Sequence, residues 1–162
     1  MKERNNAIEQ AAREREWILR EKYHGAETPD FFQDLERLRQ GEPLDYVIGF
    51  SNFLGLKIDL SLRPLIPRTE TEYWVEQAIE KIRQAYPNKD SVKILDIFSG
   101  SGCIGLAALD RLPNATVDFA DVNPRAAEQI EKNINLLGFD QSRARVYSSD
   151  VYASIPKGEY DV

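Results

Sequence analysis

The chain has 162 residues, of which 42% are hydrophobic and 30% charged, a balance that excludes collagen-like, low-complexity and disordered proteins. Its formal net charge is −6, from 27 acidic and 21 basic residues. Nucleic-acid-binding proteins gain most of their affinity by neutralising phosphates with basic side chains, so this acidic balance argues against DNA or RNA as a partner. A single cysteine and a single histidine exclude an internal disulfide, a multi-cysteine zinc site and a two-histidine metal site in one chain, and we expect no metal.

No apolar run reaches the length that crosses a bilayer, and the first residues are charged rather than apolar as in a signal peptide. We therefore expect a cytoplasmic protein that does not enter a membrane. Residues 1–40 are predicted to form a segment of two short helices. Thr28 followed by Pro29 marks the start of the second helix, with Thr28 as the cap and Pro29 in the first turn.

Residues 41–68 are predicted to form a β-hairpin and a linker. The apolar run over residues 46–48 is interpreted as part of this hairpin, and Leu56, Ile58 and Leu60 alternate with polar residues as in a half-buried strand. Pro64 and Pro67 then favour an extended backbone.

Residues 69–162 are predicted to be the first half of a Rossmann-like α/β domain. Thr69 and Glu72 have the spacing of a capping box at the start of a helix. Strands are expected over residues 92–96, 115–120 and 144–148, with helices between them, the last starting at Asn123 and Pro124. Such alternation predicts parallel βαβ units. Residues 160–162 resemble the start of a fourth strand, and we interpret the chain as a fragment of a longer protein.

The connection after the first of these strands carries the clearest chemical signal. Gly100 and Gly102 form a glycine-rich turn between a strand and a helix, where a ligand can approach the backbone closely. Asp121 ends the next strand, where an acid can accept hydrogen bonds from both ribose hydroxyls of a nucleoside. Asp150 ends the third strand and could meet an amino group of the base.

Two nucleoside cofactors fit this layout. Gly100, Gly102 and Gly105 spell G-x-G-x-x-G, the fingerprint of dinucleotide binding, but that match is weak by itself. Asp96 favours the other cofactor, because its carboxylate would repel a pyrophosphate and attract the sulfonium and ammonium groups of S-adenosylmethionine. The sequence therefore favours S-adenosylmethionine over a nicotinamide or flavin dinucleotide.

Two further motifs are much more specific than the glycine loop. Residues 41–49 read G-E-P-L-D-Y-V-I-G, and residues 65–72 read L-I-P-R-T-E-T-E. Together with the loop from Asp96 to Gly102, Asp121 and Asp150, they resemble the release factor glutamine methyltransferases of the HemK/PrmC type. The resemblance covers residues 41–162.

This resemblance implies a partial Rossmann-like methyltransferase domain and S-adenosylmethionine-dependent methylation of the glutamine amide in the Gly-Gly-Gln motif of peptide chain release factors. By the same resemblance, Ser99, Gly100, Ser101 and Gly102 would hold the methionine end of the cofactor, Asp121 the ribose, and Asp150 with Val151 the adenine. Three charged residues of the second motif would lie in a linker near the cofactor, namely Arg68, Glu70 and Glu72.

Two departures from the family pattern affect these expectations. Phe98 stands where the family has the first loop glycine, so its side chain is expected to point away from the ligand. The catalytic Asn-Pro-Pro-Tyr motif of the family does not occur among these 162 residues. That motif would align the amide nitrogen with the methyl group, so we expect these residues to bind the cofactor without methylating alone.

Three other functions remain open from the sequence. A nucleic-acid amino-methyltransferase can use a similar Asn-Pro-Pro-Tyr motif, but the charge and the linker motif disfavour it. A dinucleotide oxidoreductase would bind NADH. A module that only binds a partner protein would bind no S-adenosylmethionine.

Overall fold

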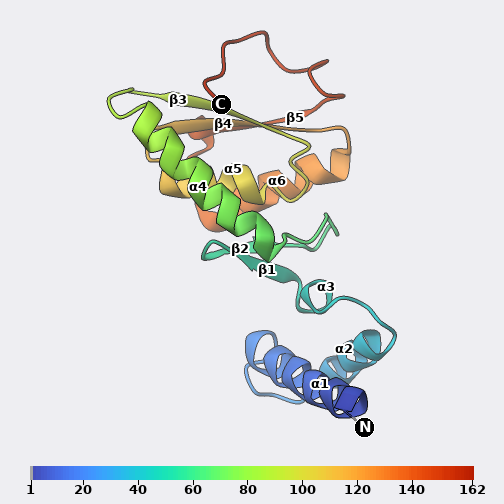
Figure 1. Cartoon of the computed structure of the whole chain (residues 1–162). Helices are drawn as coiled ribbons and strands as arrows, with labels where there is room; N and C mark the ends of the chain where they lie inside the picture. Colours follow the sequence, from blue (N-terminus) through green and yellow to red (C-terminus); the bar gives the residue numbers. More distant parts are fainter. Residues whose placement is uncertain (1) are drawn as a thin grey trace. The chain divides into compact units, whose positions relative to one another are not determined.

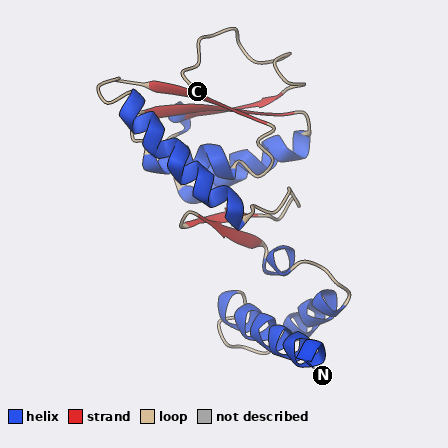
Figure 2. Ribbon diagram, in the orientation of Figure 1, coloured by secondary structure: helices blue, strands red, loops and turns tan. Residues whose placement is uncertain are grey.

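A computed structural model describes residues 2–162, with side chains from Glu9 onward, so Met1 lies outside the described residues. The chain divides into two compact units, Met1–Gly49 and Phe50–Val162. Their helices and strands are shown in Figure 1 and coloured by type in Figure 2. In the described part of the chain, no helix combines the length and apolar character needed to span a membrane.

The first unit is helical, as the sequence predicts. It contains α1 (Lys2–Glu21), α2 (Pro29–Arg39) and α3 (Leu44–Ile48). The predicted start of α2 is confirmed, because the Thr28 hydroxyl accepts a hydrogen bond from the backbone N–H of Phe31 at 3.3 Å.

The prediction of strand structure over residues 46–48 is wrong, because these residues belong to the short helix α3. Pro43 precedes its first turn, and Gly49 ends it with a left-handed φ of 95°. The helical turn buries Val47 and Ile48, with 0% and 8% of their surface exposed. Apolar and β-branched residues favour a strand, but two of three adjacent side chains can be buried equally well on one side of a helical turn.

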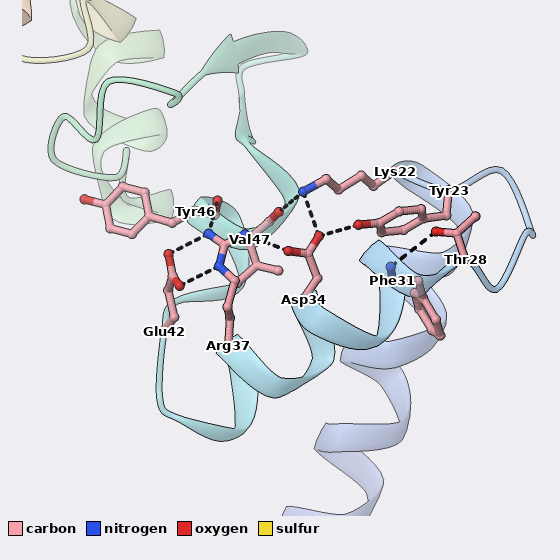
Figure 3. A network of polar contacts seen from close by, with 9 residues as sticks. All are labelled: Lys22, Tyr23, Thr28, Phe31, Asp34, Arg37, Glu42, Tyr46 and Val47. Carbon is pink, nitrogen blue, oxygen red and sulfur yellow. Dashed lines mark hydrogen bonds and ion pairs between the residues drawn. The ribbon is translucent and has the colours of Figure 1, made fainter.

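A buried carboxylate, Asp34, links the helices of the first unit (Figure 3). It accepts hydrogen bonds from the Lys22 ammonium at 2.7 Å, the Tyr23 hydroxyl at 2.7 Å and the Arg37 guanidinium at 2.6 Å. Burial alone would raise the pKa of Asp34, but these three donors outweigh it and the pKa lies below its usual value. Arg37 also binds both carboxylate oxygens of Glu42 at 2.8 Å, so the Glu of the G-E-P motif is tied to α2.

The second unit begins with an antiparallel hairpin of β1 (Phe50–Phe53) and β2 (Leu56–Asp59). The two turn residues, Leu54 and Gly55, have positive φ values of 49° and 88°, as in a type I′ turn. The turn is held from two sides, since the Leu54 N–H donates to Glu72 at 3.2 Å and Arg111 donates to the Leu54 carbonyl at 2.8 Å.

Three parallel strands form the main sheet of this unit, in the order β3 (Val92–Ile97), β4 (Ala115–Asp121), β5 (Ala144–Ser148). They alternate with α4 (Thr69–Ala85), α5 (Cys103–Arg111) and α6 (Pro124–Leu137), and a 3-10 turn, η1 (Gln141–Arg143), precedes β5. The three helices lie on the same face of the sheet (Figure 2). The predicted strands and the parallel βαβ topology are confirmed, and the unit has the partial Rossmann-like fold expected.

The helix boundaries of the second unit are only partly as predicted. The cap of α6 is confirmed, because the Asn123 side chain accepts from the Arg125 N–H at 3.0 Å. The predicted capping box is wrong: α4 has no side-chain cap, and the Glu72 carboxylate binds the hairpin turn instead. The Leu54 N–H competes successfully for this carboxylate because the turn would otherwise leave that donor without a protein partner.

The final residues pair with the outer edge of β3. The Asp161 N–H donates to the Lys93 carbonyl at 2.8 Å, and the Leu95 N–H donates to the Val162 carbonyl at 2.9 Å. This backbone pairing agrees with the expectation that residues 160–162 begin a fourth strand, and the structure places them beside β3.

Candidate functional site

The connection from β3 to α5 has an unusual backbone. Three of its residues have left-handed φ values, 59° at Phe98, 56° at Gly100 and 79° at Gly102. Between them, the Ser99 hydroxyl donates to the Asp96 carbonyl at 2.6 Å and accepts from the Ala120 N–H at 3.0 Å. The buried Ser99 side chain therefore fastens the loop to the ends of β3 and β4.

The three glycines of G-x-G-x-x-G meet different constraints. A Cβ at Gly105 would lie 2.3 Å from Cε1 of Phe119 on β4, so this glycine lets α5 pack closely on the sheet. A Cβ at Gly102 would lie 3.1 Å from Cγ1 of Ile130. Gly100 has no such neighbour, since the nearest atom to its Cβ position is 4.0 Å away. The backbone of Gly100 is thus the one of the three that a ligand can approach.

Asp121 connects the glycine loop to the end of β4. Its Oδ2 accepts from the Gly100 N–H at 2.9 Å, and its Oδ1 accepts from the Asn123 N–H at 2.9 Å. Each carboxylate oxygen has a second acceptor position. The half-buried carboxylate can therefore hold the loop and still bind hydroxyl groups of a ligand.

A pocket of about 440 Å³ lies at this edge of the sheet, beside the carboxyl ends of β3 and β4. Its walls come from the glycine loop, the end of β4, the start of α6 and the linker before α4. Its lining includes Phe98, Ser99, Gly100, Ser101, Cys103, Ile104, Asp121, Asn123, Arg125, Ala126, Thr71 and the linker residues 62–68. The volume suits a small-molecule ligand, and the position is where open α/β sheets bind ligands.

The pocket brings together six of the residues that the sequence assigns to the site: Arg68, Phe98, Ser99, Gly100, Ser101 and Asp121. Gly102, Glu70 and Glu72 do not line it, nor do Asp150 and Val151. Asp150 is exposed, and Val151 has a left-handed φ of 48°, a strained conformation for a β-branched residue.

Asp96 also lies outside the pocket wall. Only 8% of its surface is exposed, and its Oδ2 accepts from the Gly105 N–H at 3.0 Å in the first turn of α5. Burial raises the pKa of Asp96 to about 6, an effect that the Gly105 N–H reduces and the nearby Asp121 increases. Of the three strand-end carboxylates, the structure therefore places only Asp121 on the pocket wall.

Cys103 lines the pocket but is 9% exposed at the start of α5. Burial raises the pKa of its thiol to about 11, so the thiol is protonated at neutral pH. Cys103 is therefore a small packed residue at the start of α5, and its thiol is not activated as a nucleophile.

Two residues that the sequence analysis does not select hold the site together. Gln129 and Asn133 are fully buried, four positions apart on the apolar side of α6. The Gln129 carbonyl accepts from the Leu62 N–H at 2.9 Å, and the Asn133 amide donates to the Ser101 carbonyl at 3.1 Å while its oxygen accepts from the Asp59 N–H at 2.8 Å. The sequence feature that could have identified these two residues is a pair of amide side chains, four positions apart on a predicted helix, among apolar residues.

A second pocket, of about 310 Å³, lies elsewhere on the second unit. Its lining includes residues near the amino ends of the strands, such as Lys93, Thr116 and Arg145. Ligands of open α/β sheets bind at the opposite, carboxyl ends, so we do not assign the cofactor to this pocket.

Comparison with known proteins gives a consistent family. The family model described as "Methyltransferase small domain" matches residues 75–162. A curated "Release factor glutamine methyltransferase" of Chlorobaculum tepidum is 34% identical over 152 residues, which cover 86% of this chain and 51% of that protein. The protein of the same name in Lactococcus lactis is 38% identical over 129 residues, covering 77% of this chain and 46% of the relative. The chain thus spans about half the length of the curated relatives it matches.

Among solved structures, a "SAM Dependent Methyltransferase" from Agrobacterium tumefaciens superposes with a TM-score of 0.50 at 20% identity. The match covers 62% of this chain and 31% of that chain. At this level of identity the likeness supports the fold only.

Proposed function

Because this chain belongs to the methyltransferase small domain family, we propose that the pocket beside Asp121 binds S-adenosylmethionine, and that the protein methylates the glutamine amide in the Gly-Gly-Gln motif of a peptide chain release factor. The family supports S-adenosylmethionine as the methyl donor. The names of the relatives, at 34% and 38% identity, support the release factor as the substrate. Such a substrate would place the protein in the cytoplasm.

The observation that carries the cofactor proposal is the bond between Asp121 and Gly100. It brings a carboxylate with free acceptor positions against the one glycine of the loop that a ligand can approach. The pocket residues fit the ribose and the methionine end of the cofactor. Asp121 would accept the ribose hydroxyls, and the guanidinium groups of Arg68 and Arg125 on the pocket wall would face the methionine carboxylate.

The remaining assignments follow the family motifs. The loop from Ser99 to Gly102 would face the methionine end mainly with its backbone, because the Ser99 side chain binds the two strands. Asp150 and Val151 would flank the adenine, and the strained φ of Val151 supports a functional role for that turn.

When bound, S-adenosylmethionine supplies an electrophilic methyl group on a positively charged sulfur. An amide nitrogen is a poor nucleophile, because its lone pair is delocalised into the carbonyl, so rate enhancement depends on positioning. The residues described here would fix the cofactor end of that alignment. Because Asn-Pro-Pro-Tyr does not occur among these 162 residues, we propose that they bind the cofactor and do not methylate by themselves.

Calorimetric titration of the 162-residue chain with S-adenosylmethionine, S-adenosylhomocysteine and NADH tests the cofactor. We expect binding of the first two compounds and none of NADH. Binding of NADH alone would favour an oxidoreductase, and binding of none would leave a partner-binding module.

The substrate is tested with the chain loaded with S-adenosylhomocysteine and immobilised. We expect the loaded chain to bind a release factor. It should bind more weakly to a release factor variant that lacks the Gly-Gly-Gln motif, and it should not bind duplex DNA at the same concentration. Preference for DNA would favour a nucleic-acid methyltransferase. Transfer of a labelled methyl group by this chain would contradict the proposal that it does not methylate alone.

A further inference from the structure

One edge of the main sheet has no partner strand in the described part of the chain. The strand order is β3-β4-β5, so β3 and β5 form the two edges. Residues 161 and 162 pair with the outer edge of β3, whereas β5 pairs only with β4. An edge strand presents a row of N–H and C=O groups that can pair with another strand. The outer edge of β5 therefore offers a place where an extended chain can be added.

One hydrogen bond identifies the backbone groups of β5 that point outward. The Ser149 N–H, directly after β5, donates to the Asp121 carbonyl at the end of β4 at 2.9 Å. Along a strand, the N–H and C=O groups of successive residues point alternately to its two sides. The backbone groups of Val146 and Ser148 therefore point away from β4. Val146 is half-buried and Ser148 is exposed, so an added chain can reach both.

A groove of about 300 Å³ lies between this edge strand and α6. Val146 lies opposite Phe119, whose ring is close to α5, so the Val146 side chain is on the helix-covered face of the sheet. Ile134 and Ala144, which are 4% and 9% exposed, contribute further apolar surface. Alternate side chains of a strand added to β5 would point into this groove. Its lining comprises Glu131, Ile134, Asn135, Gln141, Ala144 and Val146.

The polar part of the groove determines which charge fits there. The Gln141 amide donates to the side-chain oxygen of Asn135 at 2.7 Å, so these two neutral groups are paired with each other. Glu131 is exposed and forms no ion pair with any described residue. The one charge on the lining is therefore negative. The groove suits small apolar side chains followed by a basic one.

We propose that the outer edge of β5 and the groove beside α6 bind an extended segment of a partner protein, in which apolar residues alternate with polar ones and a basic residue is adjacent. The segment would pair with the backbone of Val146 and Ser148 as a further strand of the sheet. Its apolar side chains would contact Ile134, and its basic side chain would lie near Glu131. In this mode of recognition, main-chain hydrogen bonds give affinity and pockets for alternate side chains give specificity.

The probe is the acetylated and amidated peptide Lys-Thr-Val-Thr-Val-Thr-Lys, whose lysines and valines fall on one face of a strand. It is titrated into the isotope-labelled 162-residue chain without S-adenosylmethionine and followed by NMR. We expect the largest shifts at the amides of Val146 and Ser148. The same peptide with N-methyl groups at every residue between the lysines keeps its side chains but cannot pair as a strand, and it should not bind.

Charge reversal tests the role of Glu131. The lysine peptide should bind about threefold more tightly than the same peptide with glutamate in place of both lysines. Glu131→Lys should reverse this preference. Glu128→Lys makes the same change on α6 at an exposed position outside the groove, so it should leave the preference as it is in the wild type. This control separates the groove from a general attraction between the basic peptide and an acidic chain.

Val146→Pro tests the strand pairing. Proline is tolerated on an edge strand where the lost N–H faces outward, so the bonds to β4 are retained. Binding of the lysine peptide should weaken at least about tenfold. If Val146→Pro does not fold, the Glu131→Lys comparison decides.

Three results would overturn the proposal. One is the absence of shifts at Val146 and Ser148, and another is a peptide preference that Glu131→Lys does not change. The third is a dimer in sedimentation experiments that Val146→Pro dissociates, since a second copy would then occupy the edge. The peptide titrations contain no cofactor, so their failure is distinguishable from failure of the proposed function.

Discussion

The carboxylate of Asp121 lies 2.9 Å from the backbone nitrogen of Gly100 and accepts its hydrogen bond. Gly100 lies in the loop after β3 and Asp121 is the last residue of β4, and the parallel register of the two strands brings them together. The same carboxylate accepts from the Asn123 N–H. Asp121 therefore shapes the loop that forms one side of the pocket and also lines the pocket itself.

We expect Asp121→Asn to weaken cofactor binding and stability together. An amide has one acceptor oxygen, so either the Gly100 or the Asn123 N–H loses its partner, at a cost of about 1–2 kcal/mol in the free energy of unfolding. The dissociation constant for S-adenosylhomocysteine should rise at least about tenfold by calorimetric titration. Asp90→Asn makes the same change in charge at an exposed position and should alter neither quantity. Unchanged binding in Asp121→Asn would remove Asp121 from the site.

Gly105→Ala should destabilise the second unit strongly. The added methyl group would lie 2.3 Å from Cε1 and 2.8 Å from Cζ of Phe119, and 2.9 Å from Cγ1 of Val117. Accommodating it requires α5 to move from the sheet, and we expect a loss of about 2–3 kcal/mol in urea unfolding. Gly158→Ala is the matched control, because its Cβ would meet nothing closer than 3.8 Å. Equal stability of the two variants would contradict the close approach of α5 to β4.

Asp96 predicts a specific pH dependence of stability. Burial raises its pKa to about 6 from the usual 3.8, so between these values the folded chain holds a proton that the unfolded chain has released. The protonated Asp96 side chain thus contributes its full stabilisation of the folded chain at low pH, and this contribution is lost as the pH rises through about 6. Relative to Asp96→Asn, the free energy of unfolding of the wild type should fall by up to about 3 kcal/mol between pH 4 and pH 7.

Urea unfolding of both proteins across this range measures the effect, since the difference between them removes the titration of all other groups. Asn can still accept the Gly105 N–H through its amide oxygen, so the hydrogen bond at this position is preserved in the variant. Parallel pH profiles for the two proteins would show that Asp96 is ionised throughout.

In the first unit, Asp34→Ala should be much more damaging than changes at neighbouring exposed acids. The substitution leaves Lys22, Arg37 and Tyr23 without their shared acceptor. Removing one partner from a buried charged network lowers the free energy of unfolding by about 3–5 kcal/mol. We expect the lower end of this range, about 3 kcal/mol, because Lys22 and Arg37 are about one-third exposed. Glu36→Ala, whose side chain is 55% exposed, is the control. Circular dichroism should show loss of helix at a lower urea concentration only in Asp34→Ala.

Periodicity and capping residues predict most of the fold of this chain. The strands around Ile94, Val117 and Val146 follow from short apolar runs, and the cap at Asn123 follows from the following Pro124. The errors arise where a local pattern supports two structures. Apolar residues before Gly49 suit a strand or a helical turn, and a Glu at capping-box spacing also suits the hairpin turn to which Glu72 binds.

The site is predicted less completely than the fold. The loop and Asp121 are brought together because strand ends in a parallel sheet share one edge. Residue types cannot tell how a carboxylate is oriented, so the sequence does not distinguish Asp121 on the pocket wall from Asp96, which turns towards α5. The sequence does not reveal Gln129 and Asn133, because the backbone groups with which they form hydrogen bonds lie 32 to 74 positions away along the chain.

The Asn133 amide has a consequence for how this unit opens and closes. One side chain on α6 is bonded to the hairpin at Asp59 and to the glycine loop at Ser101, so neither segment can be released without breaking contacts that also restrain the other. Backbone amides in the two segments should accordingly exchange with solvent deuterium as one cooperative group. A nucleoside that immobilises the glycine loop would then slow amide exchange in the hairpin as well, although the nucleoside does not contact the hairpin.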